Sequence, residues 1–140
     1  MIINSVLLDM DMPNAFALVT GRINEWWPGE RRHSGDRSST IFLLASGRFY
    51  ERASDGREVE LGKVTLWNEP QTILFDFYIA TGPDHPTEVE IRFEAEAAAT
   101  RVTVIHRPKP ESVHLWDERS PRYATSWAIV LASLERHAGS

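Results

Sequence analysis

The sequence predicts an α+β domain in which a curved antiparallel sheet of about seven strands holds a long C-terminal helix. Two observations predict it. Apolar and polar residues alternate through most of residues 39–106, which is typical of strands with one buried and one solvated face. Residues 120–138 then carry their apolar side chains on one helical stripe. A sheet with one apolar face and a helix with one apolar stripe are expected to pack as two layers.

The N-terminal part is expected to contain one strand and two short helices. Residues 2–8 form a short apolar run that is typical of a strand. Apolar residues then recur at helical spacing, so a short helix or helix pair is predicted over residues 13–27, interrupted near Gly21. Pro28-Gly29 ends this segment, because this dipeptide does not continue a helix.

Six further strands are expected to follow as a meander. Gly47 separates the first two, and the SDG motif at residues 54–56 is typical of a hairpin turn. Gly62 lies in mid-strand, where glycine is typical of a bulge. The expected strands cover residues 39–45, 48–53, 58–67, 72–80, 87–95 and 100–106.

The last helix is expected to begin at Ser120. Serine is a favourable N-cap and Pro121 suits the first helical position. Over residues 120–138 such a helix spans about 27 Å, which is enough to cross a sheet. Its stripe consists of Tyr123, Trp127, Val130, Leu131, Leu134 and Ala138.

Composition excludes several classes of function. With 140 residues, the chain is expected to form one domain over residues 1–140. It has no cysteine, which excludes disulfides, thiolate metal sites and a cysteine nucleophile. A net charge of −5 argues against nucleic acid as a partner, because the phosphate backbone attracts cationic surfaces.

The sequence also carries no sign of a membrane, a metal or a cofactor. No run approaches the roughly 18 apolar residues of a membrane span, and the N-terminus lacks the basic region of a signal peptide. A cytoplasmic location is therefore expected. The five histidines lack the spacing of metal ligands, and glycine-rich phosphate loops and nucleophile-elbow motifs are absent.

Five segments, in this order, carry a resemblance to a known superfamily. They are Trp26-Trp27-Pro28, the block GRFYERASDGREVELGKVTLWNEP, the strand PTEVEIRF, the segment TRVTVIHR, and the Trp127 helix with Leu131 and Leu134. Together they resemble the helix-grip superfamily, which includes START domains and Bet v 1-like proteins. Within it the chain is most similar to the branch named after the Hsp90 ATPase activator, the AHSA1-like or SRPBCC-domain proteins.

The chain departs from that branch at two places. It has Glu69-Pro70-Gln71 where the family often has Glu-Pro-Pro, and His106-Arg107-Pro108 where the family often has His-Arg-Gly. Pro108 is expected to stiffen the loop over residues 107–119, which borders the cavity entrance in such folds. The resemblance implies a hollow between sheet and last helix that binds a small, mostly apolar molecule. It implies no single chemistry, because one fold hosts many functions.

The alternation along the strands predicts which residues would line such a hollow. If the apolar face points inward, its aromatic side chains either surround a pocket or fill a solid core, and both alternatives stay open. The direction of Trp67 depends on Gly62, because a bulge there would change the parity of its strand. The candidate apolar wall consists of Phe49, Trp67, Phe75, Phe77 and Trp127.

Glu51 and His106 are the ionisable residues whose parity also places them inside. Each is a candidate polar contact for a ligand, since buried titratable groups are enriched at functional sites. The alternatives are an ion pair or a wet position near the SDG turn for Glu51, and a hydrogen-bonded core residue for His106.

Three tryptophans are candidates for the cavity mouth. Trp26 and Trp27 are adjacent on a short helix, so one is expected to face inward and the other to be exposed or to cap the mouth. Trp116, expected in a loop, is either a lid or an anchor for a partner. Plain packing under the loop is the alternative. An exposed tryptophan in this set would favour a homodimer.

The function expected from these patterns is the binding of a small hydrophobic molecule between the sheet and the last helix, without a cofactor. The first alternative is an enzyme, cyclase-like or hydrolase-like, that uses Glu51 or His106 as general acid or base on a carbonyl substrate. The second is an interaction protein of the Hsp90 co-chaperone type, although Hsp90 itself is not the expected partner.

Overall fold

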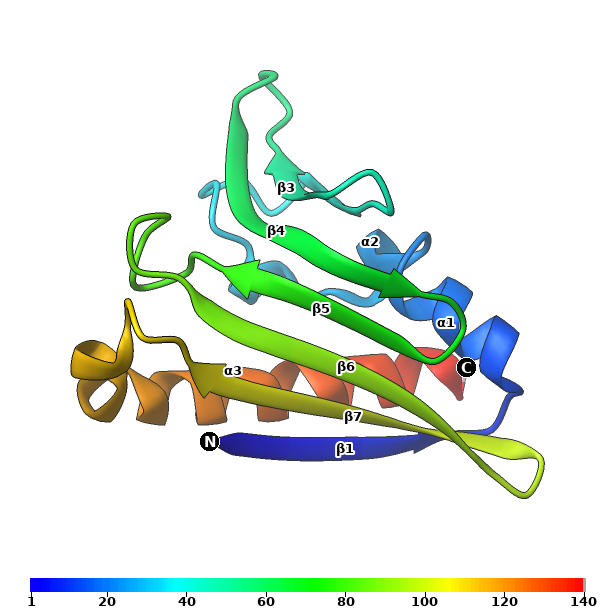
Figure 1. The fold of residues 1–140 in the computed structure, drawn as a ribbon. Coiled ribbons are helices and arrows are strands. Elements are labelled where there is room, and N and C mark those ends of the chain that lie inside the picture. The colour runs from blue at the N-terminus through cyan, green and yellow to red at the C-terminus, as the bar shows by residue number, and fades with distance from the viewer. Residues whose placement is uncertain (140) are drawn as a thin grey trace.

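Seven strands form one antiparallel sheet that curves around the C-terminal helix (Figure 1). The computed structural model describes residues 1–139. The strands are β1 (Ile2–Leu8), β2 (Thr40–Leu43), β3 (Arg48–Arg52), β4 (Glu58–Asn68), β5 (Thr72–Phe77), β6 (Thr87–Glu96) and β7 (Ala99–Pro108).

The strand order is β1-β7-β6-β5-β4-β3-β2, with β1 and β2 at the two edges. Strands β2 to β7 therefore form the meander that the alternating pattern predicts, each pairing with the next strand in sequence. The first strand closes onto the last, and Ile2 lies opposite His106. The expected α+β fold with a helix held by a curved sheet is confirmed.

Strand β4 contains two bulges. On the β3 side, Leu61 is the extra residue between the paired positions Glu60 and Gly62. On the β5 side, Thr65 is the extra residue. An extra residue bends a strand and increases its twist. The bulge expected near Gly62 is confirmed, and it contributes to the curvature of the sheet.

The helical segments all belong to the layer that covers the sheet. They are α1 (Met12–Val19), α2 (Ile23–Trp26), the single 3₁₀ turn η1 (Gly29–Arg31) and α3 (Val113–Ala138). Asp11 caps α1 by accepting a hydrogen bond from the backbone N–H of Asn14 at 3.0 Å. The predicted interruption near Gly21 is confirmed, because α1 ends before it and α2 begins after it.

Helix α3 begins at Val113 and not at Ser120 as the sequence predicts. Ser-Pro is a local signal for a helix start, but Pro121 lies inside α3. The preceding turns are held by Trp116, whose ring centroid lies 5.3 Å from that of His106. Tertiary packing has outweighed the local signal. Trp116 is therefore a half-buried helical residue and not part of a loop.

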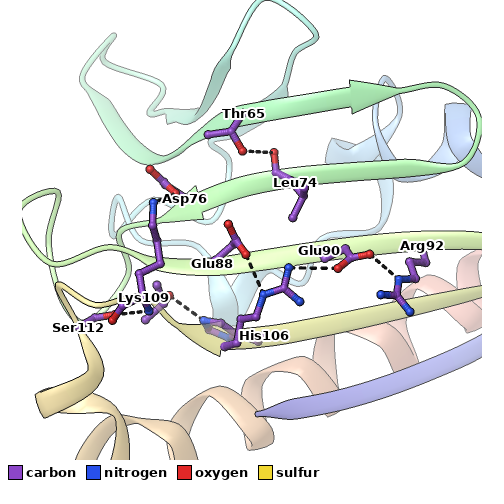
Figure 2. A network of polar contacts seen from close by, with 11 residues as sticks. Thr65, Leu74, Asp76, Glu88, Glu90, Arg92, His106, Lys109 and Ser112 are labelled. Carbon is purple, nitrogen blue, oxygen red and sulfur yellow. Dashed lines mark hydrogen bonds and ion pairs between the residues drawn. The ribbon is translucent and has the colours of Figure 1, made fainter.

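The outer face of the sheet carries a ladder of ion pairs (Figure 2). Lys109 contacts Asp76 at 2.8 Å, and Arg107 contacts Glu88 at 2.7 Å and Glu90 at 3.1 Å. These residues come from β5, β6 and β7 or from just beyond β7. Pairs of this kind on a partly exposed face contribute little each. The polar face predicted for the sheet is therefore present, and the charges of these residues are paired within the molecule.

No helix within residues 1–139 is long and apolar enough to cross a membrane.

Candidate functional site

Glu51 is fully buried on β3 and binds the backbone of the segment that follows η1. Its two carboxylate oxygens accept hydrogen bonds from the backbone N–H groups of His33 (2.7 Å) and Ser34 (2.8 Å). Burial acts to raise the pKa of Glu51, but hydrogen bonds from the Ser34 side chain and from these two N–H groups outweigh it, so the pKa is lowered. Glu51 is a charged anchor for this loop.

His106 is also fully buried, at the centre of a polar network between the sheet and α3. The indole N–H of Trp127 donates to Nδ1 at 3.0 Å, so the ring proton lies on Nε2, which is 2.7 Å from the hydroxyl of Thr87. Burial lowers the pKa of His106 to about 3, and the N-terminal ammonium acts in the same direction. Its imidazole is therefore neutral at neutral pH.

Tyr123 extends this network toward the end of β5. Its hydroxyl donates to the carbonyl of Ile79 at 2.6 Å, and its ring centroid lies 4.2 Å from that of His106. Burial raises the pKa of the Tyr123 hydroxyl. Glu51 and His106 share no hydrogen-bond partner within the described chain, so the two ionisable residues belong to separate structural networks.

A pocket of about 210 Å³ opens between α3, the segment after β5 and the segment around η1, and we call it the outer pocket. Its mouth carries the charged side chains of Glu30, Arg31, Arg32 and Arg122, together with His33, whose pKa is lowered by burial. Its wall is apolar and largely aromatic, formed by Trp27, Phe77, Ile79, Tyr123, Trp127 and Val130.

A second, much smaller space of about 20 Å³, the inner void, lies deeper under α3. It has room for about one water molecule. Trp27 and Trp127 line both spaces and meet edge to face, with ring centroids 6.2 Å apart. The Trp27–Trp127 pair therefore lies between the outer pocket and the inner void. The rest of the interior on this side of the sheet is packed core.

The residues predicted from the sequence fall into three groups: those that line the outer pocket, those that line the inner void, and those that line neither. Phe77, Trp27 and Trp127 line the outer pocket. Phe49, Phe75 and Trp26 line the inner void. Glu51, Trp67, His106 and Trp116 line neither of the two.

Trp67 lies against α1, where its ring meets that of Phe16 edge to face at 5.3 Å. The bulge at Thr65 precedes it and shifts the parity of the strand end. The structure thus places Trp67 in the part of the core under α1, outside the lining of the outer pocket and the inner void.

Trp26 and Trp27 are both buried, with 5% and 7% of their surfaces exposed, so neither is the exposed residue of the expected pair. The other alternative, that one of them caps the cavity mouth, stays a prediction, and Trp27 does line the outer pocket. Their indole N–H groups donate to the carbonyls of Leu18 (2.8 Å) and Arg31 (3.1 Å). Helix α2 ends at Trp26 and the backbone of Trp27 is already extended, so the helical argument for opposite directions does not apply. Neither residue offers an exposed anchor for a second copy of the chain.

Sequence reasoning missed the cationic mouth of the outer pocket. Arg31 and Arg32 follow Trp27-Pro28-Gly29, and Arg122 lies one turn before Ser126 on α3. The run Glu-Arg-Arg-His at residues 30–33 is a local signal of charge next to the aromatic wall. Only the fold brings Arg122 to the same opening.

No protein-family model matches the chain, and no curated protein does. Solved structures do resemble it. The self-sacrificing resistance protein CalC from Micromonospora echinospora has a TM-score of 0.74 at 23% identity, over 98% of this chain and 92% of its own.

Two further solved structures are also similar. DynU16, from the dynemicin biosynthetic locus, has a TM-score of 0.65 at 17% identity, over 99% of this chain and 47% of its own. CalU16 from Micromonospora echinospora has a TM-score of 0.57 at 15% identity, over 94% of this chain and 74% of its own. At these identities the similarity establishes the helix-grip fold and leaves the branch and the function to be inferred from the site.

Proposed function

We propose that this protein binds a small, largely apolar molecule in the outer pocket between the sheet and α3. The observation that carries the proposal is the pocket itself, about 210 Å³ of space with an aromatic wall next to an otherwise packed core. Concave, mostly apolar sites with a few polar groups at their edge are typical of small-molecule binding. The fold shared with a resistance protein and with a protein of a biosynthetic locus supports it.

The size of the outer pocket limits the ligand. Drug-sized ligands occupy pockets of about 300–1,000 Å³, which is more than this pocket offers. A ligand with one or two fused rings fits inside, or a larger molecule inserts one end and leaves the rest at the mouth. Flat rings suit the wall best, because Trp27, Phe77 and Trp127 offer both ring faces and ring edges.

Binding is favoured over catalysis by the positions of the two ionisable residues. The enzyme alternative needs Glu51 or His106 to reach a substrate atom. Neither lines the outer pocket, both are fully buried, and hydrogen bonds from protein groups already occupy their reactive atoms. We therefore propose a ligand-binding member of the SRPBCC type; for the AHSA1-like branch the support is the resemblance of the sequence pattern alone.

A blocking variant tests this proposal. Ser126 lines the outer pocket, whereas Ala128 is exposed on the same helix, so Ser126→Trp fills the pocket and Ala128→Trp is its matched control. Melting temperatures are measured with bicyclic aromatic compounds, aromatic polyketides, plant and steroid hormones and fatty acids. We expect at least one class to raise the melting temperature of the wild type and of Ala128→Trp, and not that of Ser126→Trp.

Tryptophan fluorescence gives a second measurement on the same samples. Trp27 and Trp127 line the pocket, so a bound aromatic molecule is expected to quench emission with the same concentration dependence as the melting shift. A panel in which no compound changes either signal, or equal binding by Ser126→Trp, would contradict the proposal.

A further inference from the structure

The mouth of the outer pocket has a charge opposite to that of the whole protein. The chain carries 20 acidic and 15 basic residues. At this opening, however, Arg31, Arg32 and Arg122 face a single carboxylate, that of Glu30. Glu30 is itself 3.9 Å from the guanidinium of Arg37. In an acidic protein, a local excess of positive charge at a pocket is a feature that attracts anions.

Arg32 has a structural task that uses most of its guanidinium. Its terminal nitrogens donate to the side-chain and backbone oxygens of Asn24 at 2.7 and 3.1 Å and to the backbone carbonyl of Trp27 at 3.0 Å. Burial lowers the pKa of Arg32, and the nearby Glu51 carboxylate opposes this effect. Arg32 therefore holds η1 and the following loop against α2. The Glu51 carboxylate partly balances its positive charge.

Arg31 and Arg122 have no such partners. Within residues 1–139, neither forms an ion pair, and the buried Nε of Arg31, like that of Arg32, has no hydrogen-bond partner. Other arginines of this chain, such as Arg48, Arg101 and Arg107, do pair with carboxylates. Because no carboxylate of residues 1–139 pairs with Arg31 or Arg122, their guanidinium groups are suited to an anionic group that a ligand brings.

The two arginines also lie next to each other. Both line the outer pocket, and both line a shallow surface depression beside it, together with Pro121 and Thr125. A planar guanidinium binds a carboxylate through two parallel hydrogen bonds. One anionic group at the mouth can therefore meet both cations while an attached ring lies against Phe77 and Trp127.

We propose that the ligand of the outer pocket is an aromatic carboxylate, with its carboxylate held between Arg31 and Arg122 and its rings held by the aromatic wall. The inference rests on the proposed ligand-binding function and adds the chemical class of the ligand to it. A carboxylate suits the site better than a phosphate ester, because the apolar wall begins directly behind the two arginines and a monoanion is less costly to desolvate than a dianion.

Three ligands with the same naphthalene ring system test the charge: 2-naphthoate, its neutral counterpart of the same shape 2-naphthamide, and 2-naphthyl phosphate. Affinities are measured by isothermal titration calorimetry at low and high salt. We expect the wild type to bind 2-naphthoate at least about tenfold more tightly than 2-naphthamide, with a difference that shrinks as salt is added.

Three variants with the same change of charge locate the effect. Arg31→Gln and Arg122→Gln are each expected to weaken 2-naphthoate binding by about tenfold and to leave 2-naphthamide binding unchanged. Arg136→Gln is the control, because Arg136 is exposed on the same helix about 21 Å from Arg122. Circular dichroism checks that each variant is folded, and Arg122, being exposed, tests the inference independently of Arg31.

The outcomes separate this inference from the proposed function. Equal binding of 2-naphthoate and 2-naphthamide by the wild type would overturn the carboxylate assignment and leave ligand binding intact. Tighter binding of 2-naphthyl phosphate would overturn the choice of a carboxylate over a phosphate. Loss of 2-naphthoate affinity in Arg136→Gln equal to that in Arg122→Gln would show a general charge effect and no site.

Discussion

At the residue scale, Glu51 acts on the pocket without touching it. Its carboxylate binds the backbone N–H groups of His33 and Ser34, which directly follow Arg31 and Arg32 in the sequence. Between the end of η1 at Arg31 and the start of β2 at Thr40, the chain forms no helix or strand. The buried carboxylate of Glu51 thus supplies the hydrogen-bond acceptors that fix the backbone of this loop.

Replacing Glu51 by glutamine tests that task. The amide NH₂ group of the new side chain would face a backbone N–H, donor against donor, and one charge-assisted hydrogen bond would be lost. We expect Glu51→Gln to lower the free energy of unfolding by about 2 kcal/mol in urea titrations. Glu94→Gln, an exposed position on β6, serves as the control and is expected to stay within about 0.5 kcal/mol of the wild type. Equal midpoints for both variants would contradict the anchoring task.

His106 makes a prediction about pH. Its pKa is lowered to about 3 in the folded protein, against an ordinary value of 6.5. Below about pH 6.5 the unfolded chain therefore binds a proton that the folded chain does not bind. Stability is expected to fall by about 1.4 kcal/mol per pH unit from this residue between about pH 6.5 and 3, and no further below.

Urea unfolding of the wild type and His106→Gln from pH 7 to 4.5 measures the contribution. Over this range we expect the stability of the wild type to fall more steeply with decreasing pH than that of the variant, whatever the offset between them at pH 7. Asp36, whose pKa is lowered to about 2 mainly by a hydrogen bond from Ser54, titrates below this range. Parallel curves would show that His106 titrates normally in the folded state.

At the scale of elements, Gly62 brings β4 and β5 into close contact. A Cβ atom at this position would lie 2.2 Å from the carbonyl oxygen of Asp76, which is backbone and cannot rotate away. Gly62→Ala is therefore expected to destabilise the protein by about 2 kcal/mol or more through separation of the two strands. Gly21→Ala is the matched control, because its nearest atom would be 3.8 Å away. Similar unfolding midpoints for the two variants would contradict the close approach.

The elements also show which structural information is local in the sequence. Strand positions follow from alternation, because period two is a property of each strand and its one buried face. The start of α3 does not, because Ser120-Pro121 is a strong local signal and the competing contact of Trp116 with His106 is a tertiary contact between α3 and the sheet. The position of Trp67 is likewise not a local property, since the bulge at Thr65 decides the direction of its side chain.

The candidate site also contains residues that the sequence predicts and residues that only the fold brings together. Phe77, Trp127 and the burial of Glu51 could be predicted from parity and the helical stripe, because burial is a property of one face. The partners of Glu51 could not, since they are backbone groups of a loop. Arg31 and Arg122 meet only after the sheet has curved and α3 has crossed it, so their joint charge is a property of the fold alone.

At the scale of the whole molecule, the Trp27–Trp127 pair decides how much of the interior is open to a ligand. The outer pocket and the inner void both border these two rings, and the core beyond them is packed. Removing one ring is therefore expected to join the two spaces. Trp27 is the better choice, because the indole of Trp127 holds the buried side chain of His106, whereas that of Trp27 donates to a backbone carbonyl, that of Arg31.

We expect Trp27→Leu to change the preferred ligand size at a moderate loss of stability. Removal of most of a buried indole should lower the free energy of unfolding by about 2–4 kcal/mol, since neighbouring side chains fill only part of the space. The joined space should then accept a third fused ring, so anthracene-2-carboxylate is expected to gain affinity relative to 2-naphthoate in calorimetric titrations. Trp67→Leu removes an indole under α1, away from both spaces, and is expected to keep the wild-type preference. An unchanged preference in Trp27→Leu would mean that other side chains of the wall, and not this ring, limit the length of the ligand.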